Sequence, residues 1–407
     1  MTEKGISTCI YESKEIIGGL IACSKEKGTL FHRVGGHVFN TKNDSVKDWF
    51  WSHFNKEKEF INARRNAVIY LNKEFINYPI ELNLNQLSED ISSTIIEELI
   101  DLTCKKDETI RETKTFGNFL ESNFGKTLYS IYFSPYNKKI WNRDLHQVPL
   151  DWLEGKLPMI SPKEIIGKNI ISSKEDGMVH SNFYYPREGG SQFIVNRLAK
   201  DLNVINEQVT LISNDKNGLK VNSDSKYYDH LVFTGNIRDL FNILDKQIIN
   251  DLDIKDILKE MKLLDSNGTT VVLCECNNNP YSWVYIPDKD IKAHRIIMTG
   301  NFSKRNTSEN ISEERSTCTV EFVGKIEEEE IKIELSKLPF ELKSIATNYS
   351  KNSYVIQNKN TRALIGKLTR LLKQKNISLC GRFAEWEYYN MDAAIESAMK
   401  LCASFDN

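Results

Sequence analysis

The chain has 407 residues, of which 40% are apolar and 27% are charged, and its formal net charge at pH 7 is −2. This composition is ordinary for a globular protein with room for two or three domains, and the near-neutral charge favours neither nucleic acid nor an anionic membrane as a partner. No run approaches the roughly 20 apolar residues that span a bilayer, and no signal-peptide pattern occurs. We therefore expect a cytoplasmic protein without a membrane span.

The eight cysteines are scattered along the sequence. No C-x-x-C pair and no Cys/His cluster with zinc spacing occurs, so free thiols are expected and no metal site is predicted. Cys274 and Cys276 are close in sequence and would lie on one face of a strand.

The first predicted element is a short strand over residues 7–11, which ends at the carboxylate of Glu12. In a dinucleotide-binding unit, an acid at the end of the second strand binds a ribose about 20 residues after a glycine-rich turn. Glu12 has that position, but only eleven residues precede it. The first strand and the glycine-rich turn do not fit into so short a segment. We expect them upstream of Met1 or on another polypeptide.

The rest of the chain alternates between helical and strand-like patterns. Helical spacing of apolar residues predominates from Ser45 to about Phe133, interrupted by a strand pair around residues 67–70 and 75–78. A turn at 184–190 precedes an amphipathic helix at 192–202. Further strand-like runs lie at 204–211, 218–221, 229–235, 269–298 and 316–322. The pattern predicts an α/β fold with a helical insertion and a second sheet.

The closing segment, Gly381 to Asp392, carries the strongest family signal. The motifs in chain order are Glu12, Ile17-Gly18-Gly19, Gly35-Gly36-His37-Val38-Phe39, Tyr136 to Trp141, Thr234-Gly235, Trp283 to Asn301, and Gly381 to Asp392. With these motifs the chain resembles UDP-galactopyranose mutase and its relatives in the wider flavin amine-oxidase and protoporphyrinogen-oxidase-like group. The resemblance runs from about Cys9 to Ser404.

The resemblance implies an α/β fold with an FAD-binding Rossmann-like domain that lacks its first strand and glycine-rich turn. This domain is expected at residues 1–44, 180–240 and 355–407. A helical insertion that belongs to the substrate domain is expected at 45–179, and a mostly antiparallel substrate-domain sheet at 241–354.

The resemblance also implies a flavin-dependent nucleotide-sugar mutase. Reduced FAD would attack the anomeric carbon of a UDP-sugar through N5, and the pyranose and furanose forms would interconvert. The implied partner is a small-molecule nucleotide sugar, and a homo-oligomer is compatible with the sequence. The residues implied to bind the cofactor are Glu12, Gly18, Gly19, Gly35, Gly36, Val209, Gly235, Arg382, Asn390, Met391 and Asp392. Those implied to bind the substrate are Tyr136, Trp141 and Arg295, and those implied to be catalytic are His37, Arg295, Tyr354 and Tyr388.

These residue types suit such roles, although each also has an ordinary structural interpretation. A guanidinium such as that of Arg295 binds a diphosphate through two parallel hydrogen bonds, but a surface ion pair is the alternative. Glycine pairs let a backbone approach a cofactor, but they also form plain tight turns. Aromatic residues such as Tyr136 and Trp141 line sugar-nucleotide sites, but most buried aromatics belong to a core.

One departure from the family pattern keeps other functions open. Where bacterial mutases carry a second diphosphate-binding arginine, this chain has Gly155, followed by Lys156. Lys156 or Arg143 would be the substitute. The alternatives are an FAD-dependent amine-oxidase-like oxidoreductase and a non-catalytic remnant of the fold.

Overall fold

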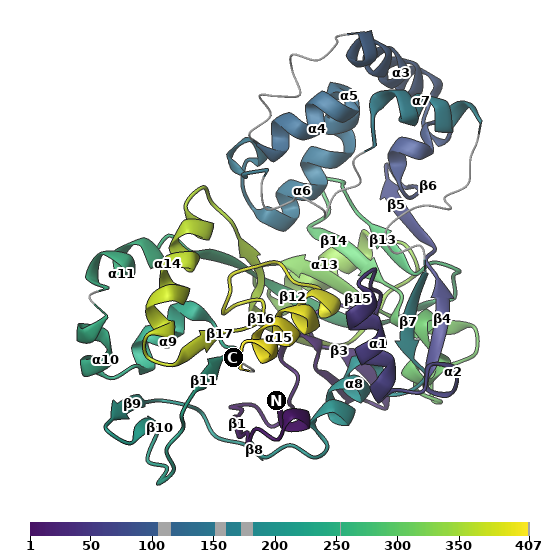
Figure 1. Cartoon of the computed structure of the whole chain (residues 1–407). Helices are drawn as coiled ribbons and strands as arrows, with labels where there is room; N and C mark the ends of the chain where they lie inside the picture. The colour runs from purple at the N-terminus through teal and green to yellow at the C-terminus, as the bar shows by residue number, and fades with distance from the viewer. Residues whose placement is uncertain (105–114, 151–159, 172–181, 253, 406–407) are drawn as a thin grey trace.

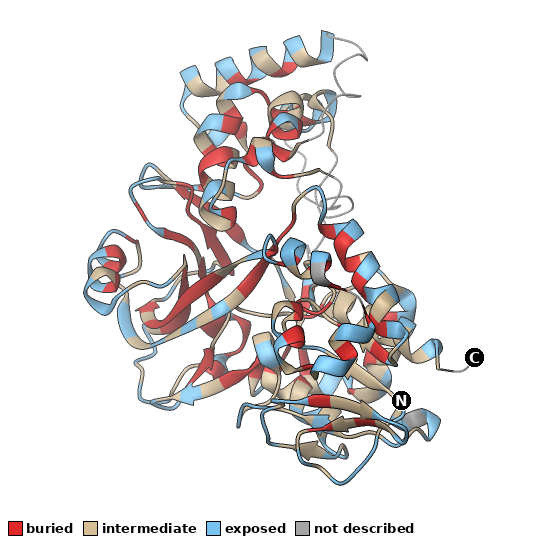
Figure 2. Ribbon diagram, turned by 90° about the vertical axis from the view of Figure 1, so that its left-hand side faces the viewer, coloured by how far each residue is buried: buried red, intermediate tan, exposed pale blue. Residues whose placement is uncertain are grey.

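A seven-stranded sheet occupies the centre of the computed structural model, which describes residues 1–104, 115–150, 160–171, 182–252 and 254–405 (Figure 1). The strands, in spatial order, are β16 (Lys343–Ile356), β12 (Asp265–Asn277), β15 (Arg315–Val323), β14 (Ala293–Ile297), β13 (Trp283–Tyr285), β5 (Ala67–Leu71) and β6 (Glu74–Asn77). All neighbours run antiparallel except β13 and β5. The predicted, mostly antiparallel sheet is confirmed, and its five central strands are largely buried on both faces (Figure 2).

A group of helices stands above one end of this sheet and forms the predicted helical insertion (Figure 1). Its members are α3 (Glu89–Cys104), α4 (Phe116–Phe124), α5 (Lys126–Leu128), α6 (Ser134–Trp141) and α7 (Pro162–Ile170). Apolar residues of these helices, such as Leu99, Phe116 and Leu120, share one core with Ile69 and Trp283 of the sheet. The burial of these side chains therefore fixes the helices against the sheet face that they cover.

Two pairs of parallel strands form the part of the structure nearest the chain termini. β1 (Ile10–Tyr11) pairs with β8 (Val204–Ile205), and β11 (Leu231–Phe233) pairs with β17 (Ile377–Leu379). Among the described residues, the two pairs remain separate sheets. Parallel strands are normally buried on both faces, yet Ile10 is 40% exposed and no residue of β11 is fully buried. This part of the Rossmann-like arrangement is thus only partly covered.

Further elements surround these sheets. Three antiparallel pairs are β2 (Cys23–Glu26) with β3 (Thr29–His32), β4 (Phe60–Arg64) with β7 (Asn182–Pro186), and β9 (Ile212–Asp215) with β10 (Gly218–Val221). The remaining helices are α1 (Asp44–His53), α2 (Lys56–Glu59), α8 (Gly190–Ala199), α9 (Ile237–Ile243), α10 (Lys246–Asp251), α11 (Lys255–Met261), α12 (Thr299–Phe302), α13 (Glu328–Ser336), α14 (Thr361–Lys373) and α15 (Met391–Ala403). Side-chain caps begin several of them, for example Asn43 at α1 and Asn236 at α9.

The strand pairing crosses the predicted domain boundaries. β5 and β6 lie within residues 45–179, the range assigned to the helical insertion, yet β5 pairs with β13 of the range 241–354. The fold class is confirmed, whereas the division into three ranges stays a prediction. Within the described part of the chain, no helix is long and apolar enough to cross a membrane.

Candidate active site

A bulge between β14 and β15 brings two basic side chains to one buried carboxylate. Ala293 lies opposite Phe322, and Arg295 lies opposite Glu321, so His294 is an extra residue on β14. Bulges of this kind re-aim side chains and are frequent beside active sites. Here Arg295 Nε donates to Glu321 Oε2 over 2.6 Å, and His294 Nε2 lies 3.4 Å from the same oxygen.

The two ionised groups of this cluster are largely shielded from solvent. Glu321 is 1% exposed, and the side chain of Arg295 is 24% exposed. Burial alone would raise the pKa of Glu321, but the positive charge of Arg295 and the contact with His294 together lower it to about 2. Burial lowers the pKa of His294. The pair therefore consists of a guanidinium and a carboxylate, both ionised at neutral pH.

Three aromatic rings stand beside Arg295. Tyr354 of β16 and Tyr388 of the closing segment stack with centroids 5.9 Å apart, and Trp141 of α6 meets both edge-on at 6.3 and 6.2 Å. Arg295 Nη2 donates to the Tyr354 hydroxyl over 3.4 Å. Burial raises the pKa of Tyr354, so its hydroxyl stays protonated and can donate to an anionic ligand.

A π-helical segment, Tyr129–Phe133, connects α5 to α6 and sets the direction of the rings on that side. Such segments insert one residue into a turn and are frequent at functional sites. Tyr136 follows on α6 and meets Tyr285 of β13 edge-on at 5.5 Å. Tyr285 is the register partner of Arg295, so the aromatic surface continues across the sheet from the charged cluster.

The loop after β3 approaches the same cluster through two glycines. Gly35 has φ +74°, and a Cβ there would lie 2.8 Å from Glu321 Oε1. A Cβ on Gly36 would lie 2.7 Å from the side chain of Ile297. Both positions therefore require glycine, Gly35 for its left-handed backbone and Gly36 for the close approach.

His37 follows these glycines and is held by its own backbone. Its Nε2 donates to the carbonyl oxygen of Val34 over 2.7 Å, so Nδ1 carries no proton in the neutral ring. Burial, with the positive charge of Arg382 as a second cause, lowers the pKa of His37 to about 4. At pH 7 the ring is neutral, and Nδ1 is available as a hydrogen-bond acceptor.

Arg382 connects the closing segment to this cluster. Its Nε donates to the Tyr389 carbonyl over 2.9 Å and its Nη1 to the Ser353 carbonyl over 3.0 Å, while the guanidinium lies 4.7 Å from the centroid of the Tyr388 ring. These bonds fix Tyr388 against Tyr354. The structure thus brings together the predicted residues His37, Gly35, Gly36, Tyr136, Trp141, Arg295, Tyr354, Arg382 and Tyr388.

The other predicted cofactor residues belong to the partly covered region around the parallel strands. Glu12 follows β1, and its carboxylate accepts from the amide of Lys14 over 2.8 Å. Gly18 and Gly19 begin the turn after it, both with positive φ. Val209 and Gly235 lie near β8 and β11, and Asn390, Met391 and Asp392 begin α15 without a side-chain cap hydrogen bond. The cofactor-binding roles of all these residues stay predictions.

The second diphosphate-binding group is not identified by the structure. Gly155 and Lys156 lie outside the described residues. Arg143 is described, and its Nη2 donates to Asp265 Oδ2 over 2.8 Å. Its guanidinium is therefore paired with the first residue of β12.

Three residues of the cluster were not predicted from the sequence, namely Glu321, His294 and Tyr285. A signal was present for Glu321, because a carboxylate within the apolar run of residues 316–323 is costly to bury without a partner. The bulge that turns His294 toward it has no comparable signal, since it depends on the register of two strands.

Glu321→Gln is expected to lower the free energy of unfolding by about 3 kcal/mol at pH 7, because it leaves the buried guanidinium without its counter-charge. The folded pKa of Glu321 lies below its ordinary value, so the stabilisation is present above about pH 4 and is lost as the pH falls toward 2. Urea unfolding at several pH values measures this. Glu328→Gln on the exposed start of α13 is the matched control, and an equal effect of both substitutions would contradict the expectation.

The similarity to known proteins covers the whole chain. No family model matches it. A probable UDP-galactopyranose mutase from Klebsiella pneumoniae is 23% identical over 416 residues, which cover 100% of this chain and 90% of that relative. A dTDP-fucopyranose mutase from Escherichia coli is 23% identical over 415 residues, which cover 99% of this chain and 93% of that relative.

The fold is likewise shared with solved structures. The crystal structure of reduced UDP-galactopyranose mutase superposes with a TM-score of 0.81 at 19% identity, covering 97% of this chain and 87% of the other. A redesigned putrescine oxidase superposes with a TM-score of 0.59 at 12% identity, covering 99% and 94%. The chain is therefore similar, over its length and in its fold, to the nucleotide-sugar mutases and flavin oxidases that its sequence motifs indicate.

Proposed function

We propose that this chain is a nucleotide-sugar mutase of the UDP-galactopyranose/furanose type. The observation that carries the proposal is the position of Arg295. It is fixed by Glu321, bonded to Tyr354 and surrounded by aromatic rings. A diphosphate needs a permanently charged donor, and a nucleoside needs flat apolar surfaces. The arrangement offers both within one site, and the similarity to two nucleotide-sugar mutases supports it.

The geometry supports the following substrate-binding roles. Arg295 contacts Glu321 Oε2 through both Nε and Nη2, and Nη2 also donates to the Tyr354 hydroxyl. The guanidinium would offer its Nη1 side to a diphosphate oxygen. The hydroxyls of Tyr354 and Tyr388 would donate to the same phosphates. Trp141, edge-on to both tyrosines, would pack against the nucleoside, and Tyr136 would extend this apolar wall.

The cofactor implied by the resemblance is FAD, whose reduced form supplies the nucleophile for the change of ring size. The residues present fit it in part. Gly35 and Gly36 allow close approach, and neutral His37 presents an acceptor at Nδ1. No strand lies between β1 and β17 among the described residues, so a cradle for the pyrophosphate is not formed there. We assign to His37 the acceptance of a hydrogen bond from the bound flavin or sugar.

Turnover measurements test the proposal. The chain, alone and extended by a strand, a glycine-rich turn and a helix, is incubated with FAD and either UDP-galactofuranose or dTDP-fucopyranose, with and without dithionite. We expect ring-size isomers only with reduced flavin and no net oxidation. A two-electron-oxidised product would support the oxidoreductase alternative. A lack of flavin binding and turnover in both versions would support a non-catalytic remnant.

The proposal also includes a nucleotide sugar as the partner and the cytoplasm as the location. A homo-oligomer stays a prediction, which light scattering of the purified protein can test.

A further inference from the structure

Two neighbouring hollows open on the surface formed by the β2–β3 hairpin, α2, α8 and the segment after α12. Their volumes are about 540 and 440 Å³. The first is bordered by the hairpin and by α8, and the second by α2, β4 and residues 303–305. Glu188 and Phe193 line both, so the hollows are adjacent parts of one groove. None of the residues that line it belongs to the candidate active site.

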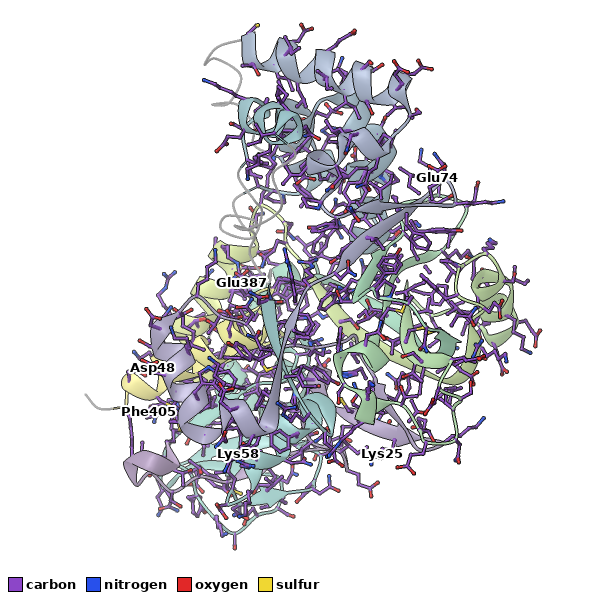
Figure 3. The ribbon with its side chains drawn as sticks, turned by 90° about the vertical axis from the view of Figure 1, so that its right-hand side faces the viewer. Lys25, Asp48, Lys58, Glu74, Glu387 and Phe405 are labelled. Atoms are coloured by element: carbon purple, nitrogen blue, oxygen red, sulfur yellow. The ribbon has the colours of Figure 1, made fainter. Side chains whose placement is uncertain are left out.

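The groove concentrates positive charge. Its cationic lining residues are Lys25, Lys58, Arg187, Arg197, Lys200, Lys304 and Arg305. Only Glu59 and Glu188 among the lining residues are acidic, which leaves an excess of five positive charges. The whole chain, by contrast, has a net charge of −2. Figure 3 shows Lys25 and Lys58 on the same face of the molecule.

Two of the arginines form ion pairs with glutamates of the groove, whereas the lysines can pair with a ligand. Arg197 bonds Glu59 over 2.5 Å and stacks on Phe193 at 5.2 Å, so it belongs to the wall of the groove. Arg305 bonds Glu188 over 2.6 Å, but both side chains are more than 60% exposed, so the pair is weak. Among the described residues, the lysine ammonium groups at 25, 58, 200 and 304 have no hydrogen-bond or carboxylate partner.

The floor of the groove differs from its rim. Leu30 is 4% exposed and lines the first hollow, the partly buried Ile61 lines the second, and Phe193 lines both. An apolar floor with a cationic rim can bind apolar groups and negative charges along the same ligand. A single inorganic anion would use only the rim.

We propose that this groove binds an acidic segment of a partner protein. Carboxylates of the segment would lie against the lysines, and its apolar side chains would enter the two hollows on either side of Phe193. Charge complementarity favours this occupant. The concave shape disfavours a flat bilayer, and the apolar floor disfavours a bare polyphosphate. The proposal is independent of the proposed catalytic function.

Fluorescence anisotropy of the full chain with a labelled glutamate–leucine peptide tests this. A lysine–leucine peptide is the charge control. We expect the acidic peptide to bind and the lysine–leucine peptide not to bind. The affinity for the acidic peptide should fall as the salt concentration is raised. Lys25→Glu combined with Lys58→Glu removes one lysine from each hollow and should weaken binding about tenfold or more. Lys289→Glu combined with Lys359→Glu, on exposed lysines outside the groove, should leave affinity unchanged.

Ile61→Ser tests the apolar floor. It should lower the affinity for the glutamate–leucine peptide several-fold and leave the salt dependence of that affinity unchanged. Thermal unfolding confirms that each variant is folded. The proposal is overturned if the acidic peptide does not bind at low salt, or if the groove reversal has no larger effect than the control reversal. Polyphosphate and anionic phospholipid vesicles are measured in the same way. The proposal is also overturned if either binds as tightly as the acidic peptide and loses the same factor of affinity in the Lys25→Glu/Lys58→Glu variant.

Discussion

In the extended chain loaded with reduced FAD, Arg295→Lys is expected to lower kcat/KM for a nucleotide sugar on the order of 100-fold, a loss of about 2.7 kcal/mol in transition-state stabilisation. Lysine keeps the positive charge beside Glu321, so the buried carboxylate does not lose its counter-charge. The substitution removes the planar guanidinium, whose Nε and Nη2 contact Glu321 and whose Nη2 also donates to Tyr354, so that Nη1 would be left for the diphosphate. We expect most of the loss in KM, because diphosphate contacts are already formed in the ground state.

Arg315→Lys is the matched control for this experiment. Arg315 is also a largely buried arginine, with a side chain that is 13% exposed and an ion pair to Glu275, but it lies at the start of β15 away from the aromatic rings. It should change kcat/KM by less than about twofold. If Arg295→Lys kept the activity of the unmodified protein, the role of Arg295 would be limited to neutralising Glu321.

Most residues that meet in this cluster could be picked out from the sequence as candidates because they lie in short, ordered motifs. Several chemistry-bearing residues lie within twelve residues or fewer in each of three motifs: the glycine pair at 35–36, the aromatic residues of 136–141 and the closing segment at 381–392. Their meeting in space was implied by the family resemblance. The structure supplies the physical cause, which is the packing of α6 and the closing segment over the bulge of β14.

Other features could not be read from the sequence because they depend on long-range register. Glu321 becomes the partner of Arg295 only through the pairing of β14 with β15, and a shift of one residue would point it to the opposite face. The placement of β5 beside β13 likewise depends on a parallel contact between segments more than 200 residues apart. The pattern of residues along a strand predicts which side chains share a face of the sheet, but it does not predict which strands pair with that strand.

Supplying one parallel strand between β1 and β17 is expected to raise FAD occupancy from near zero to on the order of one flavin per chain. The amide of Ile10 bonds Asn203, just before β8, and the amide of Glu12 bonds Ile205 of β8, so the backbone groups of Tyr11 face the opposite edge. Directly after β17, the amide of Cys380 bonds the carbonyl of Phe233, and by the same alternation the backbone groups of Leu379 face away from β11. Among the described residues, no further strand pairs with either edge.

The design of this extension follows from the first residues. The amide of Gly5 bonds the carbonyl of Thr2, the amide of Ile6 bonds that of Met1, and Gly5 has φ +75°. These two bonds around a left-handed glycine are the pattern that ends a helix. A fused apolar strand, glycine-rich turn and helix can therefore lead through this turn into β1.

A version of the extension with alanine in place of its turn glycines separates the two effects of the added segment. Both versions should bury the exposed strand edges and the helix α15, none of whose residues is fully buried in the chain alone, and so should unfold more cooperatively in urea than the unextended chain. Only the glycine version should show the visible flavin absorption band, because a Cβ in the turn blocks the approach of the pyrophosphate to the backbone amides. Stoichiometric flavin in the unextended chain would contradict this expectation, since the described residues would then hold the pyrophosphate without a glycine-rich turn.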